Sequence, residues 1–105
     1  MRIRKEFEEM PDEKIVQTAR ISEALAHPGR IKIFRYIMKC NSERTPVRNK
    51  DIVANFEYSQ ATISQHLNKM VIAEIIKTKQ ESTSTYYFVN IGIIGKYIEL
   101  LKTFE

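Results

Sequence analysis

The sequence SQATISQHLNKMV, residues 59–71, carries the strongest structural signal in this chain. At about 100° per residue around a helix, Ile63, Leu67 and Met70 fall on one side and predict a buried stripe. The opposite side holds short polar side chains, amides and one methyl group, where an ordinary solvated helix carries Glu and Lys. Ser59 predicts the N-cap, because its hydroxyl can accept from a free backbone N–H group. We therefore expect a helix whose outward side suits the edges of DNA bases, with a merely polar surface helix as the alternative.

The segments that flank this helix predict a helix-turn-helix followed by a wing. Before it, Asn49 is expected to cap a helix from Lys50 to about Phe56, and a short linker follows. After it, residues 75–80 and 85–89 are rich in Ile, Thr, Tyr, Phe and Val and predict two strands joined by a polar tip. Two short helices separated by a tight turn are typical of a helix-turn-helix.

Three more helices and an N-terminal arm complete the prediction. Pro28 and Gly29 break the chain direction, so one helix is expected to end at His27 and the next to begin at Pro28. Residues 1–105 are expected to form one mainly α domain with a small β-hairpin wing, in the α+β class. The predicted parts are an arm over 1–11 with Ile3, Phe7 and Met10 on one side, helices over 12–27, 28–40, 50–56, 60–71 and 91–104, and a dimerisation segment over 91–105.

Composition restricts the class of protein. The chain has 105 residues, of which 43% are hydrophobic, so it can close one modest core. Its 17 basic and 13 acidic residues give a net charge of +4, which mildly favours an acidic partner. The single Cys excludes a disulfide framework and a multi-thiolate metal site within one chain. No run approaches the roughly 20 apolar residues of a membrane span, and the N-terminal pattern is not a secretion signal, so we expect a cytoplasmic protein without a membrane partner.

The predicted DNA contacts fall into two groups. Gln and Asn amides can pair with adenine, Ser and Thr hydroxyls suit either base edge, and an Ala methyl meets a thymine methyl. Basic side chains, the free N–H groups behind a capping Ser and a His at the edge of the buried stripe can meet phosphates. The base contacts expected are Gln60, Ala61, Thr62, Ser64 and Gln65, and the backbone contacts are Ser59, His66, Lys69, Lys77, Lys79, Arg48 and Lys50.

Two of these assignments have open alternatives. His66 is also consistent with a packed, hydrogen-bonded helix residue, which is the simpler interpretation. The basic residues between 31 and 50 are consistent with a solvated helix face as well as with a patch that faces phosphates. That basic cluster consists of Lys32, Arg35, Lys39, Arg44, Arg48 and Lys50, with Glu43 as its only acid.

Four motifs together resemble the ArsR family of bacterial and archaeal winged-helix repressors. They are ALAHPGRI at 24–31, KDIV at 50–53, SQATISQHL at 59–67 and YYFV at 86–89, and the resemblance extends over about residues 15–101. It implies a homodimer that represses transcription by placing two recognition helices in successive major grooves of a palindromic operator. It also implies that Gln60, Ser64 and Gln65 contact bases, with Thr62 close by.

The chain departs from the family pattern in three places. Residues 50–56 lack the paired cysteines with which many members sense metals, and the last helix has no His. The resemblance therefore predicts a regulator that does not respond to metals and needs no cofactor. The Gly that usually ends the recognition helix is absent from VIAEI at 71–75, which predicts either a strained left-handed cap or a different turn. The wing tip also lacks the usual Gly-Arg pair.

The last helix carries more apolar surface than a small domain needs. One stripe contains Ile91, Ile94, Ile98 and Leu101, and Ile93, Tyr97, Leu100 and Phe104 lie beside it. The second stripe implies a partner surface, most simply another copy, with Gly92 and Gly95 allowing close approach; the alternative is a helix embedded in its own chain. The arm over 1–11 is a possible addition to that surface. The dimer contacts expected are Ile91, Ile94, Tyr97, Ile98, Leu101, Ile15 and Ala19.

Two other functions compete with a repressor. A winged helix can serve as a protein-interaction module, either as an antirepressor or as an assembly subunit. Cys40 would allow a redox-responsive regulator, although a buried, inert thiol is the simpler interpretation. An enzyme is not expected, because the two His are far apart and no phosphate loop or nucleophile-base pair is present. The inducer cannot be inferred from the sequence.

Overall fold

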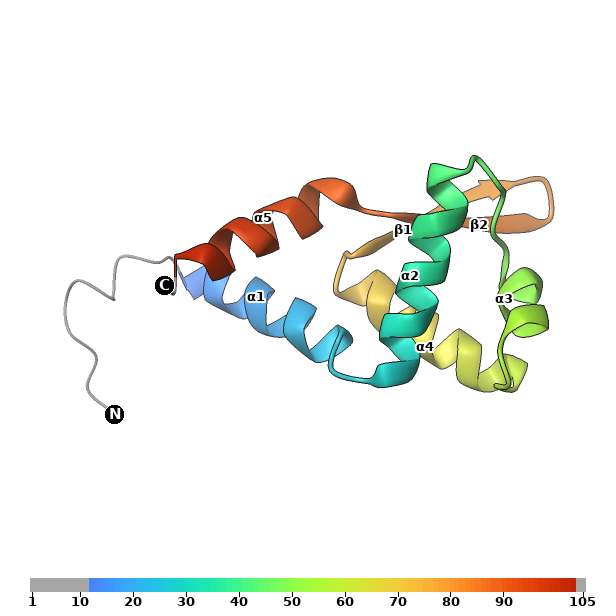
Figure 1. Ribbon diagram of the computed structural model, residues 1–105, viewed down its shortest axis with the longest axis horizontal. Coiled ribbons are helices and arrows are strands. Elements are labelled where there is room, and N and C mark those ends of the chain that lie inside the picture. Colours follow the sequence, from blue (N-terminus) through green and yellow to red (C-terminus); the bar gives the residue numbers. More distant parts are fainter. Residues whose placement is uncertain (1–11, 104–105) are drawn as a thin grey trace.

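A computed structural model describes residues 12–103 of the chain and confirms the predicted winged helix-turn-helix. The described residues form five helices and one two-stranded antiparallel sheet (Figure 1). The elements are α1 Asp12–Ala24, α2 Pro28–Ser42, α3 Asn49–Asn55, α4 Gln60–Ile72, β1 Ile76–Glu81, β2 Ser84–Val89 and α5 Ile91–Lys102. The predicted arm over residues 1–11 and Phe104 lie outside the described residues.

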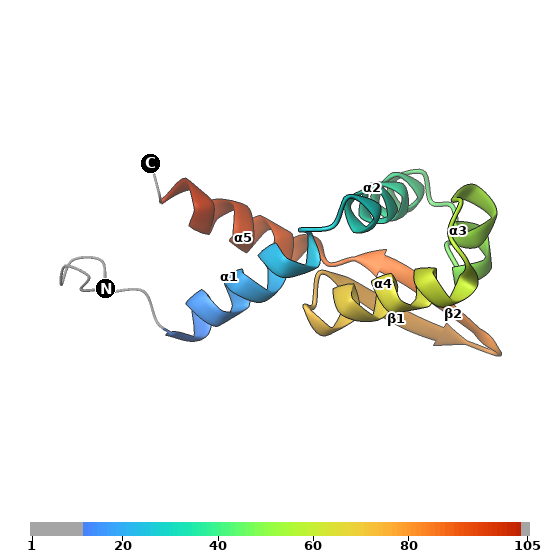
Figure 2. The ribbon, with the colours of Figure 1, turned by 90° about the horizontal axis from the view of Figure 1, so that it is seen from below.

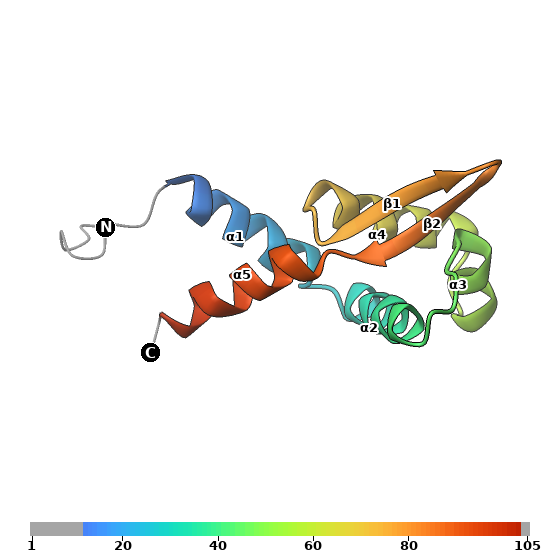
Figure 3. The same ribbon diagram turned by 90° about the horizontal axis from the view of Figure 1, so that it is seen from above.

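The core lies where α2, α3, α4 and the hairpin meet. The predicted stripe on α4, Ile63, Leu67 and Met70, is fully buried there. Ile33 and Ile37 of α2 are also fully buried and belong to the same apolar cluster. Figures 2 and 3 show α3 at the end of the molecule away from α1 and α5, with the hairpin running along α4. The arrangement holds α4 by one side and leaves its other side exposed.

The first helix ends earlier than predicted, and His27 has a different role. α1 stops at Ala24, because His27 is the N-cap of α2 and its Nδ1 accepts a hydrogen bond from the Gly29 N–H at 3.0 Å. Pro28 occupies the first position of α2, where its missing N–H costs nothing. A Cβ at Gly29 would lie 2.8 Å from the Tyr58 hydroxyl, so any larger residue there would have to displace that side chain. α2 also runs on to Ser42, beyond the predicted end at residue 40.

The predicted cap of α3 is wrong by one residue. The N-cap is Arg48, and Asn49 is the first residue of the helix. The Arg48 N–H donates to Asp51 Oδ2 at 2.8 Å, and its side-chain Nε reaches the same oxygen at 3.2 Å. A carboxylate at the third position of a helix can replace a capping side chain in this way. The prediction for α4 is confirmed, since Ser59 Oγ accepts from the Thr62 N–H at 3.2 Å.

The turn after α4 adopts the strained cap that the missing glycine predicted. Glu74 has a φ of 64°, in the left-handed region. Its N–H donates to the Val71 carbonyl at 2.9 Å, and the Ile75 N–H donates to the Met70 carbonyl at 3.1 Å. These two bonds form a Schellman motif, in which Glu74 takes the position that favours glycine.

The hairpin is buried at its base and exposed at its tip. Ile76 pairs with Val89 at its base, and both are buried, whereas the tip is exposed. A third segment joins its edge, because the Tyr87 N–H donates to the Val47 carbonyl at 3.0 Å. Among residues 12–103 no helix is long and apolar enough to cross a membrane.

Candidate nucleic-acid interface

The outward side of α4 carries the predicted base-contact residues together. Four of them are exposed: Gln60, Ala61, Ser64 and Gln65. Thr62 is half-buried, and its Oγ1 accepts a hydrogen bond from the Ser59 hydroxyl at 3.0 Å. The exposed face follows from the burial of the opposite stripe, because residues four apart lie on the same side of a helix. The sequence prediction of two distinct faces for this helix is therefore confirmed.

A groove joins the start of α4 to α3 and to the wing. It has a volume of about 380 Å³ and brings Arg48 and Lys50, two predicted backbone contacts, beside Gln60, a predicted base contact. Ser84, Thr85 and Tyr87 of β2 form its other wall. Sequence pattern does not identify Ser84 or Thr85 as site residues, because only the packing of the hairpin brings them to the start of α4. A groove walled by basic and small polar groups suits a phosphate backbone.

Asn49, which was predicted only as a helix cap, also lines this groove and forms a hydrogen bond with Ser64, a predicted base contact. Its Nδ2 donates to Ser64 Oγ at 3.0 Å across the α3–α4 turn. Since Ser64 Oγ accepts this bond, its own hydroxyl proton remains available for an outside acceptor. The Asn49 Oδ1 atom is buried and has no hydrogen-bond partner among residues 12–103.

Arg48 is held in place at the mouth of the groove. The Arg48–Asp51 ion pair is partly shielded, with about a third of each side chain exposed. Burial raises the pKa of the Asp51 carboxyl, but the hydrogen bonds and positive charge of Arg48 outweigh it and hold that pKa below its usual value. The guanidinium carbon also lies 6.0 Å from the centre of the Tyr86 ring. These contacts orient the side chain before any ligand binds.

The other predicted backbone contacts lie apart from this groove. Lys79 pairs with Glu81 at 3.1 Å and lines a second groove, of about 410 Å³, together with Arg44 and Phe88. Lys77, opposite Phe88, is exposed on the same strand. Lys69 lies at the other end of α4, where its Nζ is 3.9 Å from the Glu23 carboxylate of α1.

His66 does not reach the surface as a phosphate contact requires. It is only 8% exposed and packs with its ring centre 4.7 Å from that of His27 and 5.8 Å from that of Tyr58. Burial lowers the pKa of His66, and electrostatic interactions with His27 and Arg30 lower it further. The structure therefore corrects the predicted backbone contact and supports the packed helix residue, which keeps a neutral ring near neutral pH.

The basic cluster of residues 31–50 is divided by the fold. Lys32, Arg35 and Lys39 are exposed along α2, and Arg44 lies in the loop after it. Only the last two members, Arg48 and Lys50, line the groove beside α4. Cys40 is half-buried and packs against the core, which agrees better with a structural thiol than with a redox switch.

Most of the predicted dimer contacts are exposed within residues 12–103. Ile91 is 77% exposed, Ile98 49% and Ile15 48%, and none of residues 91–102 is buried, so α5 is not embedded in its own chain. Leu101 and Ala19 are also exposed, whereas Ile94 and Tyr97 are half-buried. A Cβ at Gly95 would meet no atom of the described residues within 4 Å. Within residues 12–103 no three His, Cys, Asp or Glu side chains lie close enough to hold a metal ion.

Known proteins share both the sequence pattern and the fold. Residues 27–78 match the family model "Bacterial regulatory protein, arsR family". The arsenical resistance operon repressor of Staphylococcus aureus is 29% identical over 52 residues, which span 50% of this chain and 50% of that relative. An ArsR-like transcriptional regulator from Rhodococcus sp. RHA1 has a TM-score of 0.77 at 15% identity, covering 88% of this chain and 82% of that chain. The homodimeric winged helix-turn-helix DNA-binding domain Mb0332 from Mycobacterium bovis has a TM-score of 0.70 at 16% identity, covering 98% and 89%. This chain belongs to the ArsR family of bacterial regulatory proteins.

Proposed function

We propose that this protein is a DNA-binding transcriptional repressor that binds a palindromic operator as a homodimer. The observation that carries the proposal is the exposed side of α4 beside the groove lined by Arg48, Lys50 and Gln60. Base-reading groups and phosphate-binding groups are adjacent there, as recognition of duplex DNA requires. The curated relative in Staphylococcus aureus is a repressor, which supports the same direction of regulation.

The contacts follow from where each side chain lies. We assign base contacts to Gln60, Ala61, Thr62, Ser64 and Gln65, because α4 presents them on or beside its exposed face. Phosphate contacts in the groove are assigned to Arg48 and Lys50, with the N-terminus of α4 behind Ser59 as a further donor. Lys69, Lys77 and Lys79 supply more distant phosphate contacts. His66 is left out because it is buried.

The homodimer is proposed to form through α5 and α1. The apolar side chains of Ile15, Ile91 and Ile98 are exposed within residues 12–103, and such a surface suits a second copy. A two-fold dimer requires two inverted half-sites, which accounts for the palindrome. The Mycobacterium bovis domain of similar fold is homodimeric, which agrees with this assembly. We also propose that regulation does not use the metal positions of other members, since the matching residues are absent from the sequence.

Replacing Gln65 and Lys77 in turn tests the proposal. Gln65→Ala should reduce discrimination at one base pair per half-site by about 1–3 kcal/mol, because an amide pair to a base is lost. Lys77→Ala should weaken binding to all sequences alike and lower the slope of log affinity against log salt by about 1 per subunit. The measurement is a gel-shift and salt titration on the upstream DNA, with Lys102→Ala on α5 as the control. Equal affinity of the wild-type protein for upstream and random DNA would contradict the proposal.

A further inference from the structure

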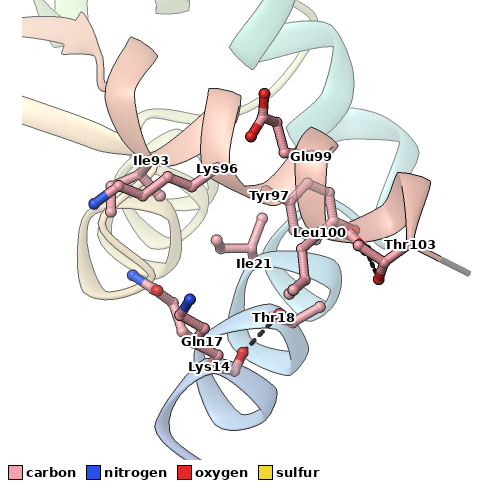
Figure 4. Close-up of a pocket in the computed structure, with 10 residues that line it drawn as sticks. All are labelled: Lys14, Gln17, Thr18, Ile21, Ile93, Lys96, Tyr97, Glu99, Leu100 and Thr103. Carbon is pink, nitrogen blue, oxygen red and sulfur yellow. Dashed lines mark hydrogen bonds between the residues drawn. The ribbon is translucent and has the colours of Figure 1, made fainter. Parts of the chain in front are cut away.

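A pocket of about 350 Å³ lies between α1 and α5 (Figure 4). Its floor is apolar and consists of Ile21 from α1 with Ile93, Leu100 and the Tyr97 ring from α5. The volume is at the low end of the range for small-molecule sites, about 300–1,000 Å³. The pocket lies away from the groove beside α4, so DNA binding does not account for it.

The polar groups that line the pocket favour a ligand with a negative charge. Lys14 and Gln17 of α1 and Lys96 of α5 line it, whereas the hydroxyl of Thr18 is occupied by the Lys14 carbonyl at 2.6 Å. In Figure 4 the side chains of Lys14, Gln17 and Lys96 lie on one side of the pocket, and the carboxylate of Glu99 points away from them. Two ammonium groups and an amide beside an apolar floor suit a molecule with an apolar body and one anionic end.

The pocket and the proposed dimer surface lie on different sides of α5. At about 100° per residue, Ile93 and Leu100 point in one direction, and the exposed Ile91 and Ile98 point in nearly the opposite one. The Tyr97 hydroxyl, bonded to Ser22 Oγ at 2.8 Å, closes the pocket toward α1 between these two directions. A second copy seated on Ile91 and Ile98 therefore contacts a different side of α5 from Ile93 and Leu100, and Tyr97, a predicted dimer contact that lines the pocket, lies between the two sides.

Both walls of the pocket are connected to the C-terminal end of α4. On the α5 side, the Ile93 N–H donates to Asn90 Oδ1 at 3.4 Å, and Asn90 Nδ2 donates to the Glu74 carbonyl at 2.9 Å. On the α1 side, Glu23 lies 3.9 Å from Lys69 of α4. These contacts give a route by which a change in the spacing of α1 and α5 would reach the C-terminal end of the recognition helix.

We propose that the α1–α5 pocket binds a small amphipathic carboxylate. Its apolar body lies on Ile21, Ile93 and Leu100, and its carboxylate lies between Lys14 and Lys96. Binding of this ligand lowers the affinity of the protein for DNA. The binding part of the proposal stands on the pocket alone, and the effect on DNA rests on the proposed function. The ligand's carboxylate oxygens accept hydrogen bonds from the two ammonium groups and the Gln17 amide. Transfer of the ligand's apolar part from water to the pocket adds a favourable hydrophobic contribution to the binding free energy.

The test is a titration of the full-length protein with octanoate and decanoate, both below their micellar concentrations, by calorimetry and by NMR of labelled protein. Octylamine is the matched probe, with the same chain and the opposite charge. The carboxylates should bind at least about tenfold more tightly than the amine, with NMR shifts centred on Ile93, Tyr97 and Leu100. Lys14→Glu and Lys96→Glu should each weaken octanoate binding by about tenfold, whereas Lys102→Glu, on the same helix but outside the pocket, should leave it within twofold.

A variant whose pocket is blocked by a larger side chain distinguishes binding in the pocket from a general effect of charge. Leu100→Trp should abolish carboxylate binding while thermal unfolding shows that the domain remains folded. Saturating decanoate should then lower the operator affinity of the wild-type protein by at least about fivefold and leave that of Leu100→Trp unchanged.

Several outcomes would overturn the inference. Absence of carboxylate binding, equal binding of octylamine, or unchanged binding by Lys14→Glu and Lys96→Glu would each disprove the site. Dissociation of the dimer by decanoate would show that the pocket belongs to the contact with a second copy. Binding without any effect on operator affinity would disprove the coupling. Because binding is measured without DNA, failure of the pocket leaves the proposed DNA binding intact, and failure of DNA binding leaves the pocket measurement valid.

Discussion

Three residues in the left-handed region of backbone space mark the points where this chain reverses direction. Arg44, Glu74 and Ser82 have φ values of 58°, 64° and 54°, and none of the described glycines has a positive φ. A side chain in this conformation costs about 1–2 kcal/mol relative to the right-handed region. The loss of the family glycine at the end of α4 was visible in the sequence, which left open a strained cap or a different turn, and the structure has the strained cap at Glu74, with the Ile75 N–H donating to the Met70 carbonyl.

Glu74→Gly should stabilise the protein. Glycine adopts a φ of 64° without a clash, so we expect the free energy of unfolding to rise by about 1 kcal/mol. The measurement is urea denaturation at fixed protein concentration. Glu74→Ala keeps a Cβ and is the matched control, and it should bring no comparable gain. An equal increase for both variants would show that the loss of the carboxylate, and not relief of the backbone, is responsible.

His66 makes stability depend on pH. Because burial lowers its pKa below the unfolded value of 6.5, the unfolded state binds the proton more readily than the folded state. Its contribution is therefore complete above about pH 6.5 and is lost as the pH falls toward the lower, folded pKa. We expect the unfolding free energy of the wild-type protein to fall more steeply between pH 7 and pH 5 than that of His66→Phe, by at most about 1.4 kcal/mol per pH unit. Parallel denaturation curves for the two proteins would contradict this assignment.

At the scale of elements, the recognition helix was the most predictable part of the molecule. Its cap at Ser59 and its buried stripe depend on neighbours within a few residues, so local pattern was sufficient. The C-terminal end of α1 and the cap of α3 were predicted wrongly, because His27 and Asp51 bond to the chain in ways that local propensity does not reveal. The Asn49–Ser64 bond joins two helices and depends on how they pack.

Asn90 connects α4, β2 and α5, and its two functions can be separated. Its Oδ1 accepts from the Ile93 N–H at the start of α5, and its Nδ2 donates to the Glu74 carbonyl at the end of α4. Asn90→Ala should lower the unfolding free energy by about 1–2 kcal/mol, since the cap and the bridging bond are both lost. Asn90→Asp keeps the accepting oxygen and should lose about half as much. Chemical denaturation checks the order, and an aspartate variant as unstable as the alanine variant would contradict the capping role.

At the scale of the whole molecule, the exposed apolar side of α5 makes a dimer the expected functional unit. Ile98→Glu places a charge where about half of an Ile side chain is exposed in one chain, and the change occurs twice in a two-fold interface. We expect the dimer dissociation constant to rise at least about a hundredfold, measured by analytical ultracentrifugation, with a matching loss of operator affinity. Ile31→Glu, on an α2 residue that is 44% exposed, is the control and should remain dimeric. A dimeric Ile98→Glu protein would exclude this surface.

Local periodicity was enough to identify the helices, the hairpin and the buried stripe of α4, and four short motifs carried the resemblance to the family, because each of these depends on residues close together in the chain. Tertiary packing alone placed Arg48, Lys50 and Gln60 in one groove, buried His66 beside His27 and Tyr58, and opened a pocket between α1 and α5. These features join residues far apart in the chain, as the pocket does for Lys14 and Thr103 and the Ser22–Tyr97 hydrogen bond does across 75 positions. Periodicity shows which face of an element is buried, but not which other element covers it, so the groove and the pocket could be found only in the folded chain.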